Sequence, residues 1–258
     1  MPPAARSSSK TRRTRPKSNS TAKKASKRRG RANGTTAPAP TAGAKRRARN
    51  IYKALTAEYP DAKCELDYSN PHELLVATIL SAQATDVGVN KATPELFRKF
   101  PTPRDYADAT PAEIEPYIKT IGLYRNKAKA IHAAMTTIVN DFDGETPRTM
   151  DELLTLRGVA RKTANVVLGN AFDINVGVVV DTHVARVGHR FGLTEETDPK
   201  KIERDLMALF PTETWCMLSH LLIWHGRRVC KARGALCAEH PICRKYCSNA
   251  KPSKDDDG

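Results

Sequence analysis

The chain has 258 residues, with 43 Lys and Arg against 28 Asp and Glu, and its formal net charge of +15 is unevenly distributed. Residues 1–50 contain 16 of the basic residues and no acidic residue, so the rest of the chain is close to neutral. No apolar run approaches the roughly 18 residues that a membrane helix needs, and the N-terminus lacks the apolar region of a secretory signal. We therefore expect neither a membrane protein nor a secreted one.

The N-terminal segment is predicted to be a disordered basic tail over residues 1–47. Residues 1–44 contain no Leu, Ile, Val or aromatic side chain, so they cannot bury enough apolar surface to offset the entropy of ordering. A mobile polycation can displace counterions along a phosphate backbone, which favours contact with nucleic acid. A solubilising tail or a targeting signal, including an organellar transit peptide, remains the alternative.

Helix start signals recur in the body of the chain, and strand signals are few. Asn70 is followed by Pro71 and Glu73, and the same cap pattern returns at Thr110–Glu113 and Thr149–Glu152. Helix ends are expected at three C′ glycines, Gly122, Gly144 and Gly192. Later helices are predicted at residues 161–172, 182–190, 199–209 and 213–227. The β-branched run 176–180 is short and has no partner, so the predicted fold class is all-α.

Residues 149–170 predict a helical hairpin, in which a short turn centred on Gly158 joins two helices. The exposed N–H groups in the first turn of the second helix, with the positive end of its dipole, suit a sequence-independent phosphate site. Arg161 and Lys162 lie at this helix start, where cations oppose the dipole, and this placement indicates a functional reason. Two solvated basic residues on an ordinary hairpin are the alternative.

The hairpin sequence resembles a known enzyme family. Leu-Arg-Gly-Val-Ala-Arg-Lys-Thr-Ala-Asn-Val-Val-Leu at 156–168 and Val-Asp-Thr-His-Val-Ala-Arg-Val at 180–187 are similar to the helix-hairpin-helix and aspartate signature of endonuclease III. The resemblance extends to residues 80–86, 117–124 and 225–227 and spans roughly 48–250. It implies a bifunctional DNA glycosylase and abasic-site lyase that removes oxidised pyrimidines from duplex DNA in base excision repair. We expect it to act as a monomer in a bacterial cytoplasm, with a nuclear or organellar setting as the alternative because of the tail.

By this resemblance, Lys162 matches the catalytic lysine and Asp181 the catalytic aspartate. A lysine amine that displaces the base from C1′ forms a Schiff base with the opened sugar, and β-elimination then cleaves the strand on its 3′ side. A carboxylate suits the stabilisation of positive charge at C1′ and assistance to proton transfer. Because Asp181 also precedes a predicted helix, we expect it to serve as the N-cap as well.

The resemblance also implies the residues that contact DNA. Gln83 and Leu123 would enter the base stack, since an amide can pair with an orphaned base and a leucine can act as a wedge. Core packing is the alternative for Leu123. Asp86 is expected to line the pocket or to act as a first-turn acid. Phosphate contacts are expected from the hairpin at Gly158, Ala160 and Arg161.

The hairpin departs from the family pattern at two positions. Where relatives usually have Pro-Gly-Val-Gly, this chain has Arg-Gly-Val-Ala over residues 157–160. A left-handed backbone would cost alanine something on the order of 1 kcal/mol. We therefore predict a right-handed backbone at Ala160, and the substitution bears on phosphate affinity rather than on catalysis.

A cysteine cluster lies near the C-terminus, with the spacing C-x6-C-x5-C-x3-C at Cys230, Cys237, Cys243 and Cys247. Relatives commonly have C-x6-C-x2-C-x5-C around a [4Fe–4S] cluster, and at the usual third position this chain has His240. We predict [4Fe–4S] ligation by all four cysteines. Zinc, held by the four cysteines or by three with His240, is the alternative. The metal would hold a basic loop against DNA, with the cations Arg227, Arg228, Lys231, Arg233, Arg244 and Lys245.

The implied architecture is two helical domains with DNA in the cleft between them. A central domain of residues 64–175 contains the hairpin at about 149–170. A second domain combines 48–63 with 176–250 and the cluster loop 230–247, and a tail of 251–258 follows. Two rival functions remain at this stage: a monofunctional adenine mismatch glycosylase, and a DNA-binding module without catalysis. The first shares the fold but lacks the hairpin lysine, and the second would not need the Lys162 and Asp181 pair.

Overall fold

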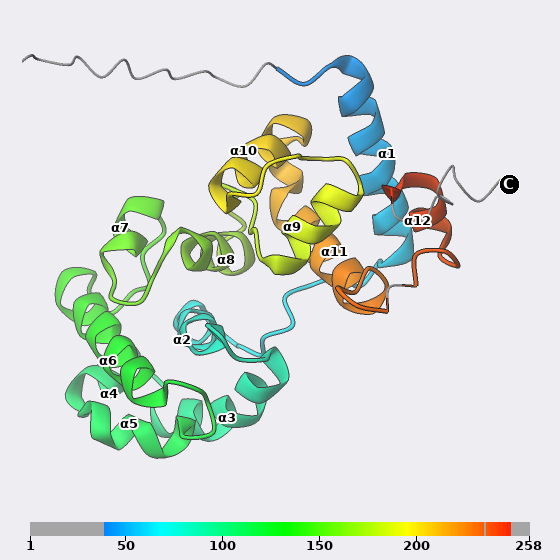
Figure 1. Ribbon diagram of the computed structural model, residues 1–258. Coiled ribbons are helices and arrows are strands. Elements are labelled where there is room, and N and C mark those ends of the chain that lie inside the picture. The colour runs from blue at the N-terminus through cyan, green and yellow to red at the C-terminus, as the bar shows by residue number, and fades with distance from the viewer. Residues whose placement is uncertain (1–38, 235, 249–258) are drawn as a thin grey trace, which may run out of the picture. The chain divides into compact units, whose positions relative to one another are not determined.

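The structure, a computed structural model, describes residues 39–234 and 236–248. All regular elements within these ranges are helices (Figure 1), as the all-α prediction requires. Most of the predicted basic tail, and the short segment after residue 248, lie outside the described residues. No described helix is both long and apolar enough to cross a membrane.

The first helix begins earlier than the composition of the tail suggests. α1 (Ala42–Glu58) starts after Thr41, whose Oγ1 accepts a hydrogen bond from Ala44 N at 3.1 Å. The predicted tail boundary at residue 47 therefore falls inside a helix. Arg47 explains the difference, because its Nη2 donates to the carbonyl oxygens of Phe191 (3.1 Å) and Tyr246 (2.8 Å). The composition of a short segment cannot indicate partners that are this distant in sequence.

Seven helices pack around a first hydrophobic core, which runs from Leu66 to Leu168 and includes the fully buried Leu74, Tyr106 and Met135. Asn70 caps the first of them as predicted, since its Oδ1 accepts from Glu73 N at 3.0 Å. The helices are α2 (Pro71–Ser81), α3 (Asp86–Lys99), α4 (Pro103–Asp108), α5 (Pro111–Ile118), α6 (Tyr124–Asp141), α7 (Met150–Thr155) and α8 (Arg161–Ala171).

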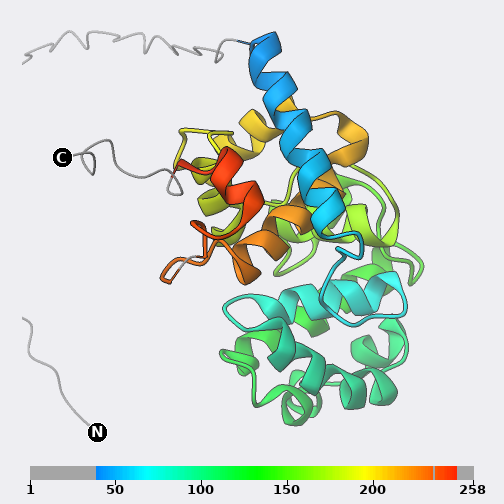
Figure 2. The ribbon, with the colours of Figure 1, turned by 90° about the vertical axis from the view of Figure 1, so that its right-hand side faces the viewer.

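A second hydrophobic core combines α1 with the C-terminal part of the chain. It joins Ile51 and Leu55 to Phe191, Leu222 and the buried cysteines. Figure 2 shows α1 and α12 side by side, although they come from opposite ends of the described chain. The described residues form one compact unit, so the domain boundaries given above stay a prediction. The C-terminal elements are α9 (Thr182–Arg190), α10 (Pro199–Leu209), the 3₁₀ turn Thr212–Thr214, α11 (Trp215–Arg228) and α12 (Pro241–Tyr246).

Two of the three predicted glycine stops have the expected left-handed backbone. Gly144 has φ +83° and Gly192 φ +62°. At Gly192 the N–H groups of residues 192 and 193 donate to the carbonyls of His189 and Gly188, which closes a Schellman motif. The third prediction is wrong, because Gly122 is not left-handed and Leu123 beside it takes φ +61° instead. The run 176–180 forms no strand in the described chain; it is an irregular connection whose Val179 N–H donates to Ser219 Oγ at 3.0 Å.

Candidate active site

The helical hairpin forms where the sequence predicts it. α7 ends at Thr155, the chain turns through Gly158 at φ +84°, and α8 begins at Arg161. A Cβ at residue 158 would lie 3.0 Å from the Cβ of Ala130, so glycine is required by space as well as by backbone conformation. The turn therefore packs closely against α6 and fixes the direction of α8.

The prediction of a right-handed backbone at Ala160 is wrong. Ala160 is the N-cap of α8 and has an extended backbone, with φ −106° and ψ 169°. An extended conformation suits any residue, so alanine carries no strain at this position. No side chain of the described residues caps the start of α8, which leaves its first N–H groups available to a phosphate.

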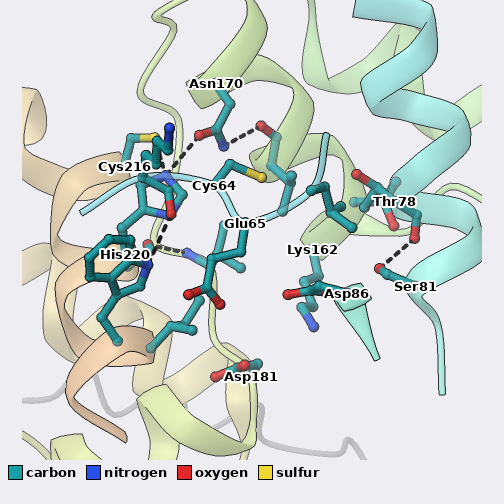
Figure 3. Close-up of a pocket in the computed structure, with 18 of the residues that line it drawn as sticks. Cys64, Glu65, Thr78, Ser81, Asp86, Lys162, Asn170, Asp181, Cys216 and His220 are labelled. Carbon is teal, nitrogen blue, oxygen red and sulfur yellow. Dashed lines mark hydrogen bonds between the residues drawn. The ribbon is translucent and has the colours of Figure 1, made fainter. Parts of the chain in front are cut away.

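Lys162 and Asp181 line one pocket of about 230 Å³, formed by residues of both cores (Figure 3). Lys162 is exposed and lies in the first turn of α8. Asp181 is the N-cap of α9, as predicted: its Oδ1 accepts from His183 N and Val184 N, both at 2.8 Å. Its Oδ2 takes no hydrogen bond from the described residues, so this oxygen can face a substrate.

Asp86 lies in the same pocket, in the first turn of α3, so both of its expected placements hold. Burial raises the pKa of its carboxyl, and among the nearby charges Lys162 lowers this pKa whereas Asp181 raises it. Three charged groups of the predicted site are therefore close enough to influence one another. Figure 3 shows Lys162 beside Asp86.

Arg227 also belongs to this pocket, which the sequence did not indicate. Its Nη2 lies 2.7 Å from Asp86 Oδ2, and its Nη1 pairs with the Glu65 carboxylate. These two ion pairs join α11 to the start of α3 and to the segment before α2. A contact of Arg227 with a phosphate backbone stays a prediction.

Arg161 is turned toward α10 rather than left free at the hairpin. Its Nε donates to both carboxylate oxygens of Glu203, at 2.9 and 3.2 Å, and the hydrogen bond raises the pKa of the guanidinium. Glu203 is buried and also accepts from Asn165 Nδ2 at 3.0 Å. This network ties the first turns of α8 to α10, and a contact of Arg161 with DNA stays a prediction.

Gln83 and Leu123 are exposed and have left-handed backbones, with φ +56° and +61°. Gln83 is the third residue of a turn from Ser81 to Ala84, which directly follows α2 and is closed by Ala84 N donating to Ser81 O at 3.0 Å. Leu123 is the N-cap of α6 and is 59% exposed. Each left-handed non-glycine residue costs roughly 1 kcal/mol, and such strain is concentrated at functional sites.

A further wall of the pocket contains residues that sequence patterns did not single out. His220 Nε2 lies 2.7 Å from Asn170 Oδ1. Because Asn170 Nδ2 donates to Val166 O at 2.8 Å, its oxygen faces the ring, so Nε2 carries the proton. Burial lowers the pKa of His220 to about 4, which keeps the ring neutral. Cys64 and Cys216 lie on the same wall, and burial raises the pKa of the Cys216 thiol to about 11. No motif marks these residues.

Comparison with known proteins identifies the family. A family model described as "HhH-GPD superfamily base excision DNA repair protein" matches residues 76–212. Endonuclease III of Synechocystis is 53% identical over 212 residues, which cover 82% of this chain and 96% of that protein. Endonuclease III of Bacillus subtilis is 48% identical, covering 72% and 87%.

The chain belongs to the endonuclease III family. Two solved structures support the assignment, a non-covalent endonuclease III–DNA complex and a trapped endonuclease III–DNA covalent intermediate. Each is 42% identical and covers 80% of this chain and 96% of the solved chain, with TM-scores of 0.76 and 0.75. A thermostable thymine-DNA glycosylase, 23% identical with a TM-score of 0.71, shares the fold.

The endonuclease III family is generally associated with an iron–sulfur cluster, and the four C-terminal cysteines of this chain fit one in number and type. All four are buried in the second core. Burial, together with the nearby Cys247 and Cys230, raises the pKa of the Cys237 thiol to about 11, so the thiols are neighbours. Within the described ranges no group of three or more His, Cys, Asp or Glu side chains is arranged to hold a single metal ion.

Side chains around the cysteines suit a sulfur-rich centre in this endonuclease III relative. Arg190 Nη1 donates to Cys230 Sγ at 3.2 Å, and His225 Nε2 lies 3.2 Å from Cys243 Sγ. His240 precedes α12, and its Nε2 lies 3.3 Å from Glu58 Oε1. Its Nδ1 is buried without a partner among the described residues.

Proposed function

We propose that this chain is a bifunctional DNA glycosylase and abasic-site lyase that removes oxidised pyrimidines from duplex DNA and then cleaves 3′ to the abasic site. The observation that carries the proposal is the convergence of Lys162 and Asp181 on one pocket, in a chain of the endonuclease III family. Its site in the cell would be the DNA of a bacterial cytoplasm, because the relatives named above come from bacteria.

In the proposed reaction the unprotonated amine of Lys162 attacks C1′ of the damaged nucleotide, and the bond from C1′ to the base breaks. The base leaves with its electron pair and takes up a proton, while the sugar opens to a Schiff base on Nζ. Loss of a proton from C2′ then expels the 3′ phosphate by β-elimination. Asp181 stabilises the positive charge at C1′ through its uncapped oxygen and assists the proton transfers.

The reaction requires the damaged base to leave the duplex, since C1′ cannot be attacked within the stack. In our proposal Leu123 enters the step as a wedge and Gln83 faces the orphaned base. Their exposure and fixed backbones support this role. The uncapped start of α8, with Gly158 and Ala160 before it, would bind the phosphate backbone.

We further propose that Cys230, Cys237, Cys243 and Cys247 hold a [4Fe–4S] cluster, with zinc as the alternative occupant. The burial of all four thiols and the hydrogen bonds to two of them support a metal-bound centre. The cluster would supply structural stability to the second core and is assigned no step in catalysis.

Borohydride trapping tests the proposed function. The wild-type protein and Lys162→Gln are incubated with a duplex containing thymine glycol, and the covalent adduct and the strand products are resolved by electrophoresis. We expect an adduct from the wild type alone, with Lys129→Gln, an exposed lysine of α6, trapping as the wild type does. Base release without an adduct would indicate a monofunctional glycosylase. Binding without release or cleavage would indicate a DNA-binding module.

A further inference from the structure

Lys127 is a buried lysine without an acidic partner. It lies in the first turns of α6, is 6% exposed, and takes part in none of the ion pairs within the described ranges. Burial lowers the pKa of its amine, with no charged neighbour to offset it. Lysine is almost never fully buried unless it is paired, so this placement requires a specific reason.

The ammonium group of Lys127 donates a hydrogen bond to a backbone carbonyl at the C-terminal end of α2. Its Nζ donates to the carbonyl oxygen of Leu80 at 2.8 Å. In a continuing helix that carbonyl would accept from residue 84, but Ala84 N donates instead to Ser81 O, in the turn that presents Gln83. Lys127 therefore supplies the missing donor at the negative end of the helix dipole. Because Lys127 bonds to Leu80 O, α2 can end and the turn at Gln83 can begin without leaving that buried carbonyl unpaired.

The same residue also fixes the start of its own helix. The backbone N–H of Lys127 donates to Leu123 O at 3.1 Å, and Asn126 N donates to the same oxygen at 3.0 Å. These two bonds close the first turn of α6 on Leu123, its left-handed N-cap. One residue thus bonds through its side chain to the helix before Gln83 and through its backbone to Leu123.

We propose that Lys127 is a positioning residue that couples the two segments entering the DNA stack, so that Gln83 and Leu123 are inserted as one rigid unit. The proposal rests on the proposed function and adds a residue that touches neither DNA nor the reacting atoms. Removing its donor would free the end of α2 and let the turn at Gln83 move relative to Leu123. Misplacement by about 1 Å is enough to slow a reaction by up to about 100-fold.

The test compares Lys127→Met, which keeps an unbranched side chain and removes the donor, with Lys129→Met on the exposed face of the same helix. Single-turnover base removal is measured on thymine glycol duplex, and extrusion is followed with 2-aminopurine opposite the lesion. We expect base removal and extrusion to be slowed about tenfold or more in Lys127→Met. Binding to undamaged duplex should stay within about twofold of wild type, and Lys129→Met should match wild type in all three.

A double variant separates positioning from general destabilisation. If Lys127 acts through the wedge, Lys127→Met combined with Leu123→Ala will be no slower than the slower single variant, because coupled residues are not additive. Multiplicative losses, or wild-type extrusion by Lys127→Met, would overturn the inference. Lys127→Gln, which retains a shorter neutral donor, should recover part of the rate lost in Lys127→Met. If Lys127→Met does not fold, Lys127→Gln should show the same losses relative to wild type in smaller degree, and wild-type extrusion by Lys127→Gln would then overturn the inference. A wild-type protein that neither traps nor extrudes would instead refute the proposed function.

Discussion

At the scale of single residues, the two exposed positions proposed to enter DNA are held in conformations that their residue types disfavour. Leu123 and Gln83 have left-handed backbones although neither is glycine. A leucine that is 59% exposed gains little from packing, so packing in the free protein does not offset the strain. In the proposed complex with DNA, a wedge that is already oriented would lose less conformational entropy when it inserts, and this would offset the strain.

Replacing Leu123 with glycine is expected to separate stability from activity. Glycine removes the left-handed penalty, partly offset by its greater freedom in the unfolded chain, so Leu123→Gly should be as stable as wild type or up to about 1 kcal/mol more stable. Its base removal should fall by about tenfold or more, since no wedge remains. Urea unfolding and single-turnover kinetics measure the two quantities.

The matched control is Lys129→Gly, at an exposed right-handed position in the same helix, which should lose about 1 kcal/mol and keep full activity. A Leu123→Gly protein that lost stability like the control would show that the left-handed backbone carries no strain.

At the scale of elements, the orientation of α8 depends on a buried contact with α10. Glu203 binds Arg161 and Asn165, and Gly177 in the connection to α9 packs directly over this network. A Cβ at residue 177 would overlap Glu203 Oε1 and would lie 2.7 Å from Asn165 Nδ2. Two sets of contacts therefore orient α8, which carries Lys162. One is the packing of the hairpin turn, and the other is the network around Glu203 of α10.

Gly177→Ala should consequently be strongly destabilising. The added methyl must displace a buried carboxylate or amide, and disruption of such a network typically costs on the order of 2 kcal/mol or more. Gly122→Ala is the control, because a Cβ there meets nothing within 4 Å and the backbone is not left-handed; its stability should change by less than about 0.5 kcal/mol. Equal denaturation midpoints for the two variants would contradict the packing described for residue 177.

The elements also show where sequence reasoning succeeds and where it stops. Helix starts such as Asn70 and Asp181 were predictable because their caps are bonded within three residues. Arg161 and Arg227 make ion pairs that the sequence could not indicate, because their acidic partners lie 42 and 162 residues away. Gly122 was misassigned because glycine permits a left-handed turn without requiring one, and the neighbouring leucine adopts it. The family motif indicated Lys162 and Asp181, whereas His220 and Lys127 owe their environments to tertiary packing alone.

At the scale of the whole molecule, the second core is made partly of cysteine. The thiols of Cys230, Cys237, Cys243 and Cys247 are packed among apolar side chains of α1, α9 and α11. If these thiols hold a cluster, the cluster is part of that core rather than an appendage. Loss of the metal should then destabilise α12 and its contact with α1, while the first core remains intact.

Cys243→Ser tests both the ligand set and this structural role. Protein purified without oxygen is analysed for iron, acid-labile sulfide and zinc, and hydrogen exchange reports on each core. We expect equal amounts of iron and sulfide in the wild type, loss of both in Cys243→Ser, and faster exchange confined to the second core. His240→Ala should retain the cluster if all four cysteines are ligands. Zinc without sulfide in the wild type would contradict the [4Fe–4S] assignment.

The pairing of α1 with α12 has a consequence for the order in which the protein can be built. Ile51 and Leu55 leave the ribosome early, but the side chains that bury them, such as Phe191 and Leu222, are synthesised much later. The buried residues of the first core, in contrast, have all been made once residue 168 has been synthesised. The contacts that bury α1 can therefore form only after nearly all of the described chain has been made, whereas those among the buried residues of the first core can form earlier.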